Sequence, residues 1–125
     1  MNLHALRRGS VVLIAFPFTD LTATKLRPAL VLSSPAFHRR HRDFILAAVS
    51  SVLERGRGFP TSVVLADGSA EFAGSGLRVS SAIHCGKLVT VRDTLVLKRL
   101  GELGAAAMRR VDDALRRAVG PAGGG

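Results

Sequence analysis

The residue with the clearest chemical potential is an arginine that stands at the start of a predicted strand. Arg27 lies directly before Pro28, and an apolar run follows at once. Proline disfavours the helical conformation for the residue before it, so Arg27 is expected to be extended. A guanidinium held at such a point can grip a phosphate through two parallel hydrogen bonds. The position also suits a plain solvated charge at a strand end, and the spacing alone leaves both interpretations open.

Two hydroxyl groups close another predicted strand. Ser50 and Ser51 follow the apolar run FILAAV. Alternation along a strand places Ser50 on the same face as Phe44 and Leu46, and Ser51 on the opposite face. Such a hydroxyl can simply satisfy nearby backbone groups. It can also donate to a phosphoryl oxygen or orient a ribose hydroxyl.

The densest basic stretch is HRRHR, residues 38–42. It is either a solvated surface connection or a site of electrostatic capture for a nucleic-acid backbone, whose affinity then falls with salt. Phe16, Phe18 and Phe37 flank these segments and offer rings on which bases can stack. Phe16 lies inside an apolar run, which favours a place in the core.

Metal and cofactor sites are not indicated. The four histidines are His4, His38, His41 and His84, and the only cysteine is Cys85. A single cysteine excludes an intrachain disulfide and a thiolate-rich zinc site. His38 and His41 stand among arginines, which repel a cation, and no carboxylate cluster stands near them. The sequence also has no glycine-rich phosphate-binding motif, so we expect no metal and no cofactor.

Composition predicts one globular domain with an anionic partner. The chain has 125 residues, of which 47% are hydrophobic, and 18 Lys and Arg against nine Asp and Glu give a net charge of +9. Such a charge favours a polyanion or an acidic surface as partner. The apolar runs are far shorter than the roughly 20 residues of a membrane-spanning helix. We expect a cytoplasmic protein without a membrane segment, with one domain over 1–119 and a flexible glycine-rich tail over 120–125.

The hydrophobic pattern predicts a mainly β fold, that is, a β-rich α+β domain. Strands are expected over 10–16, 27–34, 43–51 and 61–66, and two more within 77–91 that pivot near Cys85 and Gly86. The intervening segments 18–25, 35–43, 54–60 and 67–76 are expected to be loops, with a flexible turn at 74–76. After Gly104 the period changes to that of an amphipathic helix, whose core-facing stripe is Met108, Val111, Leu115 and Val119. A small curled antiparallel sheet or barrel with a C-terminal helix fits this order.

Four segments resemble a known family when they are taken in order. GSVVLIAFPFTD, KLRPALVLSS, DFILAAVSS and LVLKRLGELGAAAMRRVDDAL are similar to segments of the MazF/PemK-like toxins of type II toxin–antitoxin systems, and the likeness runs from Gly9 to Gly120. The resemblance implies an SH3-like barrel with a C-terminal helix, usually as a homodimer. It also implies a metal-independent endoribonuclease, an mRNA interferase, that cuts single-stranded RNA at short sequences. A cognate antitoxin with an acidic, disordered segment would block the RNA groove.

The resemblance also implies roles for individual residues. Arg27 matches the family's catalytic arginine, and Ser50 stands at its catalytic Thr/Ser position, with the hydroxyl kept and the methyl of the commoner threonine lost. The loop from Asp20 to Lys25 is the one that closes over substrate. The expected RNA-binding residues are Phe18, Asp20, Thr24, Lys25 and Ser51. Val52 stands where many relatives carry a polar residue, so one RNA contact is expected to be missing.

The reaction that the resemblance implies is attack of the RNA's own 2′-hydroxyl on the adjacent phosphate, which leaves a 2′,3′-cyclic phosphate and a 5′-hydroxyl. Arg27 and Ser50 would stabilise the charge on the phosphoryl oxygens. The general base is not assigned, and His38, His41 and His84 are the histidines that could fold close to Arg27. The alternative is a relative with the same fold that cuts no RNA and acts as a gyrase poison or as a nucleic-acid or protein binding module.

Overall fold

The computed structural model describes residues 2–17, 24–53 and 58–121. Its strands are β1 (Ser10–Pro17), β2 (Thr24–Val31), β3 (Asp43–Ser50), β4 (Ser62–Leu65), β5 (Ser81–Arg92) and β6 (Val96–Glu102). Its helical segments are the short 3-10 turns η1 (Leu3–Ala5) and η3 (Asp93–Leu95) and the helices α1 (Pro35–His41), α2 (Ala70–Ala73) and α3 (Ala105–Val119).

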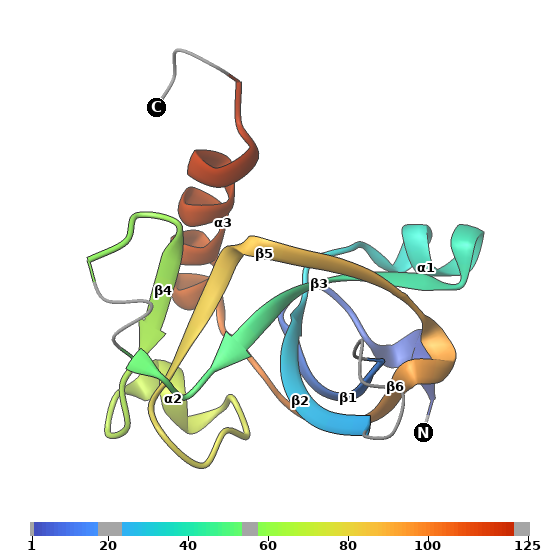
Figure 1. Cartoon of the computed structure of the whole chain (residues 1–125), viewed down its shortest axis with the longest axis horizontal. Coiled ribbons are helices and arrows are strands. Elements are labelled where there is room, and N and C mark those ends of the chain that lie inside the picture. The colour runs from blue at the N-terminus through green and yellow to red at the C-terminus, as the bar shows by residue number, and fades with distance from the viewer. Residues whose placement is uncertain (1, 18–23, 54–57, 122–125) are drawn as a thin grey trace.

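The strands form one curled antiparallel sheet. Its order is β4-β5-β3-β2-β1-β6, and every neighbouring pair is antiparallel. Figure 1 shows the strong curl of β1, β2 and β6, with α3 standing beside β4 and β5. Within the described residues the pairing is an open series with β4 and β6 at its edges. The prediction of a β-rich fold with a C-terminal helix is confirmed, and the hydrogen bonds between the described strands form a curled sheet without closing a barrel.

Both faces of the central strands are buried, as the near-continuous apolar runs predict. On one face Val11, Ala47 and Val49 join a cluster that reaches α3. On the other face Ile14 and Leu46 join a second cluster, closed by side chains from η1 and from the start of β6. Successive residues of a strand point to opposite faces, so an apolar residue at every position supplies both clusters.

The C-terminal helix forms where its period predicts it. Ala107, Val111 and Ala114 are buried against the sheet, and the side chain of Arg110 donates to the carbonyl oxygen of Val64 in β4 at 3.1 Å. The predicted core position of Val119 is wrong, since that side chain is 62% exposed. The last turn of α3 projects beyond the sheet, so its stripe has nothing to pack on there (Figure 1). None of the described helices is long and apolar enough to span a membrane.

The segment 35–43, predicted as a loop, contains the helix α1. Ser34 caps it by accepting from the backbone N–H of Phe37 at 3.1 Å, and Pro35 occupies the first turn, where its missing N–H is harmless. The helix ends at His41, and the next residue, Arg42, caps it with a φ of 59°. Because the cap begins at Ser34, β2 ends at Val31 rather than at residue 34.

The segment 77–91 contains one strand and not the two that were predicted. β5 pairs with β3 along its length, but the register changes between Ala47, which faces Leu88, and Ala48, which faces His84. The extra residues 85–87 form an irregularity in the ladder at the predicted pivot. A bulge of this kind bends a strand without ending it. The predicted bend near Cys85 and Gly86 is therefore present, but it lies inside one strand instead of separating two.

The segment 74–76 is held tightly, which corrects the prediction of a flexible turn. Ser75 is fully buried, and the carbonyl oxygen of Gly74 accepts from the backbone N–H of Glu102 at 2.9 Å. Gly76 has a φ of +75°, and a Cβ placed on it would lie 2.0 Å from the carbonyl oxygen of Leu100. The segment therefore packs backbone to backbone against β6.

A charged cluster beside this contact gives the fold a pH dependence. Arg7 donates to Glu102 at 2.5 Å, and Arg99 donates to the same carboxylate at 3.1 Å. The Arg7 hydrogen bond is the main reason why the pKa of Glu102 lies below its ordinary value of 4.5. The stabilisation is therefore complete above pH 4.5 and is lost as the pH falls through the lowered value.

We expect Glu102→Gln to lower the free energy of unfolding at pH 7 by a modest amount, because Arg7 is largely exposed and solvent screens the pair. The gap between the two proteins should close as the pH falls through the lowered pKa of Glu102, because the carboxyl of the unmodified protein then becomes protonated. Urea unfolding at pH 7 and at a series of acidic pH values measures it. A gap that keeps its size to the lowest pH at which both proteins fold would show that the charge of Glu102 is not what stabilises this contact.

Candidate active site

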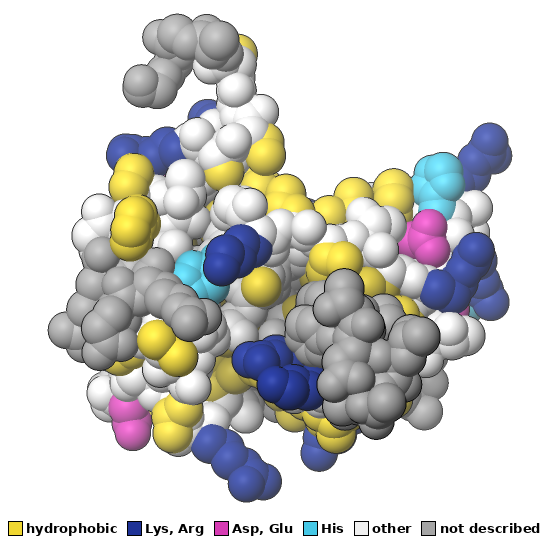
Figure 2. Space-filling view, viewed as in Figure 1, with side chains coloured by type: hydrophobic (Ala, Val, Ile, Leu, Met, Phe, Trp, Pro, Cys, Tyr) yellow, Lys and Arg dark blue, Asp and Glu magenta, His cyan; other side chains and the backbone are white. Residues whose placement is uncertain are grey.

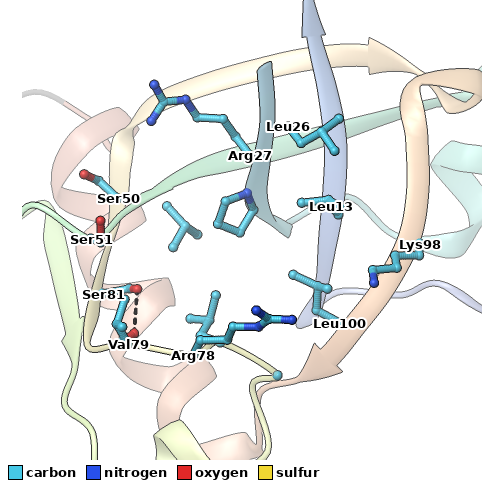
Figure 3. Close-up of a pocket in the computed structure, with 14 residues that line it drawn as sticks. Leu13, Leu26, Arg27, Ser50, Ser51, Arg78, Val79, Ser81, Lys98 and Leu100 are labelled. Carbon is cyan, nitrogen blue, oxygen red and sulfur yellow. Dashed lines mark hydrogen bonds between the residues drawn. The ribbon is translucent and has the colours of Figure 1, made fainter. Parts of the chain in front are cut away.

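A pocket opens in the sheet where β2 and β3 stop pairing. Its volume is about 390 Å³. β1, β2, β3 and β6 line it, together with the segment that leads from Gly76 into β5. Arg27 and Ser50, which the sequence singled out, both line it, and so does Ser51 (Figure 3).

Strand register explains why Arg27 and Ser50 line the same pocket. Ala29 in β2 faces Ala48 in β3, and the pairing of these two strands extends from there toward Val31. If the same register is continued two residues toward the start of β2 and the end of β3, Arg27 lies opposite Ser50. At that point the two strands no longer pair, and the space between them becomes the pocket.

Arg27 lies inside β2 rather than at its entrance, because the strand begins at Thr24. It is extended, as Pro28 predicts, and it faces Ile14 of β1. The pairing of β2 with β3 stops just before Pro28, which has no N–H to donate to a neighbouring strand. Arg27 therefore sits on a strand that β1 holds on one side and that the pocket borders on the other.

Ser50 is the last residue of β3 and is half-buried. Its hydroxyl oxygen accepts from the backbone N–H of Val52 at 3.1 Å. This bond occupies a lone pair only, so the O–H proton can still be donated. The backbone role foreseen for this hydroxyl is present, and it leaves room for the chemical one.

The other predicted RNA-binding residues fall into three groups. Ser51 lines the pocket and is exposed. Lys25 is exposed in β2, opposite Phe16, and is not among the lining residues. The backbone of Thr24 begins β2, and the positions of Phe18 and Asp20, with most of the predicted closing loop, lie outside the described residues.

None of the four histidines is among the residues that line this pocket. His38, predicted on a charged surface, is buried, where its Nε2 lies 2.9 Å from a carboxylate oxygen of Asp93 and its ring stacks on Phe44. His84 is buried elsewhere, with its Nδ1 3.0 Å from the hydroxyl of Ser62. His38 is thus a structural residue that ties α1 to η3, and no residue of the basic stretch 38–42 lines the pocket.

Cys85 offers no nucleophile. Its side chain is fully buried, and the thiol lies 3.8 Å from the carbonyl oxygen of Val111. Burial, with a smaller contribution from the negative charge of Asp112, raises the pKa of this thiol to about 11. The thiolate, which is the reactive form, is therefore disfavoured.

Two further cations line the pocket, and sequence reasoning missed both. They are Arg78, in the connection between α2 and β5, and Lys98, in β6. Arg78 is an isolated basic residue, and Lys98 stands beside Arg99 in a segment to which the family resemblance gave no site residue. Only the packing of the segment 74–76 against β6 brings them together, and no pattern in the sequence signals that contact.

The pocket is electrostatically one-sided. Arg27, Arg78 and Lys98 line it, and its lining includes no carboxylate from the described residues. The space-filling view shows Lys and Arg side chains on this face of the molecule (Figure 2). Such a cavity attracts an anion. The described part of the chain contains no group of three or more His, Cys, Asp or Glu side chains arranged to hold a metal ion.

The sequence from residue 7 to residue 119 matches the family model of the PemK-like, MazF-like toxins of type II toxin–antitoxin systems. The chain belongs to this family. The resemblance drawn from the four ordered segments is thereby confirmed. No curated protein gives a significant sequence match.

Solved structures of family members share the fold. An endoribonuclease in complex with its cognate antitoxin from a mycobacterial species is 22% identical, with a TM-score of 0.73, and the match covers 93% of this chain and 96% of that one. Mycobacterium tuberculosis toxin MazF-mt6 is 19% identical, with a TM-score of 0.68 and coverage of 87% and 94%. MazF in a MazE–MazF structure from Deinococcus radiodurans is 23% identical, with a TM-score of 0.69 and coverage of 90% and 94%. At these identities the likeness establishes the fold.

Proposed function

We propose that this protein is the toxin of a type II toxin–antitoxin module and a metal-independent, sequence-specific endoribonuclease that cuts single-stranded RNA. The observation that carries the proposal is the meeting of Arg27 and Ser50 at one basic pocket without a lining carboxylate. Family membership supports it, as does the fold shared with a protein described as an endoribonuclease. The curled sheet also supports the SH3-like barrel architecture that the family resemblance implies.

The pocket chemistry fits attack by the RNA's own 2′-hydroxyl. The 2′-oxygen forms a bond to phosphorus, the bond from phosphorus to the 5′-oxygen breaks, and the products are a 2′,3′-cyclic phosphate and a 5′-hydroxyl. Negative charge grows on the phosphoryl oxygens in the transition state, where Arg27 can make two parallel hydrogen bonds and Ser50 can add a third. The 2′-hydroxyl gives up one proton, and the leaving 5′-oxygen takes one up. No histidine among the described lining residues is placed to carry either proton.

The proposed partners follow from the same charge. An acidic, disordered segment of a cognate antitoxin would compete with RNA for the basic pocket, since both bring negative charge to it. Relatives in two of the solved structures are in complex with an antitoxin or paired with MazE. We expect the active form to be a homodimer.

The proposal is tested by incubating the purified protein with a long, unstructured RNA in the presence of EDTA. We expect discrete fragments, because neither Arg27 nor Ser50 needs a metal to act. Loss of cutting on chelation would overturn the metal-independent mechanism. Intact RNA together with trapped gyrase–DNA complexes would overturn the nuclease assignment in favour of a gyrase poison.

Ser50→Ala should lower the rate of RNA cleavage about 100-fold, which is the usual effect of removing one donor to a developing oxyanion. Ser50→Thr keeps the hydroxyl and should keep most of the activity. Single-turnover cleavage rates for the three proteins provide the comparison, with urea unfolding as a check, because Ala also removes the bond to the N–H of Val52. Unchanged cleavage by a folded Ser50→Ala protein would remove Ser50 from the reaction.

A further inference from the structure

The end of the pocket opposite Arg27 and Ser50 carries two cations with no assigned role. Arg78 and Lys98 are both exposed and both line the pocket. In Figure 3 their head groups turn toward one another, across the pocket from Arg27 and Ser50. The pocket therefore has two basic ends and not one.

Carboxylates do not neutralise these two cations. In the described part of the chain many arginines make salt bridges to carboxylates: Arg7, Arg8, Arg42, Arg92, Arg99, Arg110 and Arg116. Arg78 and Lys98, like the exposed Arg117, make no such bridge to a described residue. Two cations that face one another repel, and an anion placed between them turns the repulsion into attraction. This end of the pocket is therefore suited to a negatively charged group.

The two cations are held on a rigid support. Arg78 follows the segment 74–76, which is bonded to β6 through the backbone N–H of Glu102. The contact is so close that a Cβ on Gly76 would lie 2.0 Å from the carbonyl oxygen of Leu100, two residues along β6 from Lys98. The backbone that carries the two side chains is thus in place before a ligand arrives, and binding costs entropy only for ordering the side chains themselves.

The space between the two basic ends is apolar and small. Leu13 and Leu100 border it in Figure 3, and Pro28 adds a further apolar surface. The volume of about 390 Å³ lies at the lower end of the range of roughly 300–1,000 Å³ for small-ligand pockets. It suits one nucleotide, with its base or ribose against the apolar wall and a phosphate at each end, better than a longer stretch of RNA.

We propose that Arg78 and Lys98 bind the phosphate next to the scissile one, so that the pocket holds one nucleotide between two phosphates. This inference rests on the proposed function, because it takes the scissile phosphate to lie at Arg27 and Ser50. Arg78 and Lys98 touch no reacting atom in this arrangement. They are positioning residues, and they act by holding the RNA in register with the catalytic end.

The test uses a short, fluorescent, single-stranded RNA that contains one cleavage sequence, and versions of it with a neutral methylphosphonate at one linkage at a time. Arg78→Ala and Lys98→Ala are each expected to raise KM about tenfold, the usual cost of a hydrogen bond to a charged group. The slope of log KM against log salt should fall by about 0.7 for each lost phosphate contact. Arg117→Ala removes the same charge from the exposed face of α3 and should change neither quantity.

The methylphosphonate series identifies the linkage. For the unmodified protein, a methylphosphonate at the linkage next to the cut should raise KM about tenfold relative to the unmodified RNA. For a protein that carries both Arg78→Ala and Lys98→Ala, the modified and unmodified RNAs should have the same KM. An equal penalty in both proteins would overturn the assignment, as would an unchanged KM in the two single variants.

The two proposals fail in different ways. If the unmodified protein cuts no RNA, the nuclease proposal fails. The phosphate site is then tested by the dissociation constant of the 2′-O-methyl form of the same RNA, which Arg78→Ala and Lys98→Ala should each raise. An unchanged dissociation constant in both variants would overturn the phosphate site. Variants that bind this RNA normally but lose binding of a polyglutamate peptide would show a carboxylate site and would also overturn it.

Discussion

Replacing Arg27 with alanine is expected to lower the rate of RNA cleavage by about 10³-fold or more, while the protein stays folded. An arginine that stabilises charge on a transferring phosphoryl group typically contributes this much, since its donors are aimed at oxygens that become more negative in the transition state. Arg27 is exposed in β2 at the pocket, so its loss should not cost core packing. Single-turnover cleavage at saturating protein measures the effect on the chemical step.

Two matched variants show what the arginine supplies. Arg27→Lys keeps the charge but not the two parallel donors, so its rate should fall between those of the unmodified protein and Arg27→Ala. Arg117→Ala, which removes the same charge from the outer face of α3, should cut at the normal rate. A folded Arg27→Ala protein with full activity would exclude Arg27 from the reaction. If Arg27→Ala and Arg117→Ala lowered the cleavage rate equally, the effect would come from the net charge of the protein and not from the position of Arg27.

The largest effect on stability is expected from Gly76→Ala. The glycine has a φ of +75°, and the added Cβ would lie 2.0 Å from the carbonyl oxygen and 2.4 Å from the carbonyl carbon of Leu100. Strain in the left-handed region and overpacking against backbone together should lower the free energy of unfolding by about 2–5 kcal/mol. That is a large part of the 5–15 kcal/mol typical of a domain. Urea unfolding followed by circular dichroism measures it.

Gly68→Ala separates the two causes. Gly68 has a φ of +94° and nothing within 4 Å of an added Cβ. It should therefore show only the conformational cost, about 1–2 kcal/mol. If Gly76→Ala costs no more than Gly68→Ala, the segment 74–76 is not packed tightly on β6, and the support proposed for Arg78 is lost with it.

The parts of the fold that sequence patterns predicted are those with a strong local signal. The apolar run from Ser10 makes a strand buried on both faces. The change of period after Gly104 marks a helix that forms over Ala105–Val119. The run that ends at Ser50 places the hydroxyl at the pocket, because the strand stops where the apolar residues stop.

One missed element carries a local signal, since Ser34 caps α1 from the residue directly before it. The other parts that could not be predicted depend on contacts between distant segments. The burial of His38 depends on Asp93, 55 residues away. The second basic end of the pocket likewise depends on the packing of 74–76 against β6, so Arg78 and Lys98 gave no sign of belonging to one site.

The pairing of Arg27 with Ser50 was only partly predictable from the sequence. Spacing along the chain did not distinguish a catalytic arginine from a strand-end charge, and the family resemblance was needed to pair it with Ser50. The structure supplies the physical link that spacing lacked, since the register of β2 and β3 sets the two residues opposite one another where the strands separate. The pairing is therefore a consequence of sheet geometry, and it puts both side chains at one cavity.

The most direct test of the proposed chemistry is the identity of the RNA ends. An unstructured RNA is incubated in EDTA with the unmodified protein or with Arg27→Ala, and the fragment termini are identified by mass spectrometry. We predict 2′,3′-cyclic phosphate and 5′-hydroxyl ends with the unmodified protein, and neither with Arg27→Ala. Ends bearing a 5′-phosphate and a 3′-hydroxyl, or cyclic phosphates formed equally fast by Arg27→Ala, would contradict the assignment of this pocket.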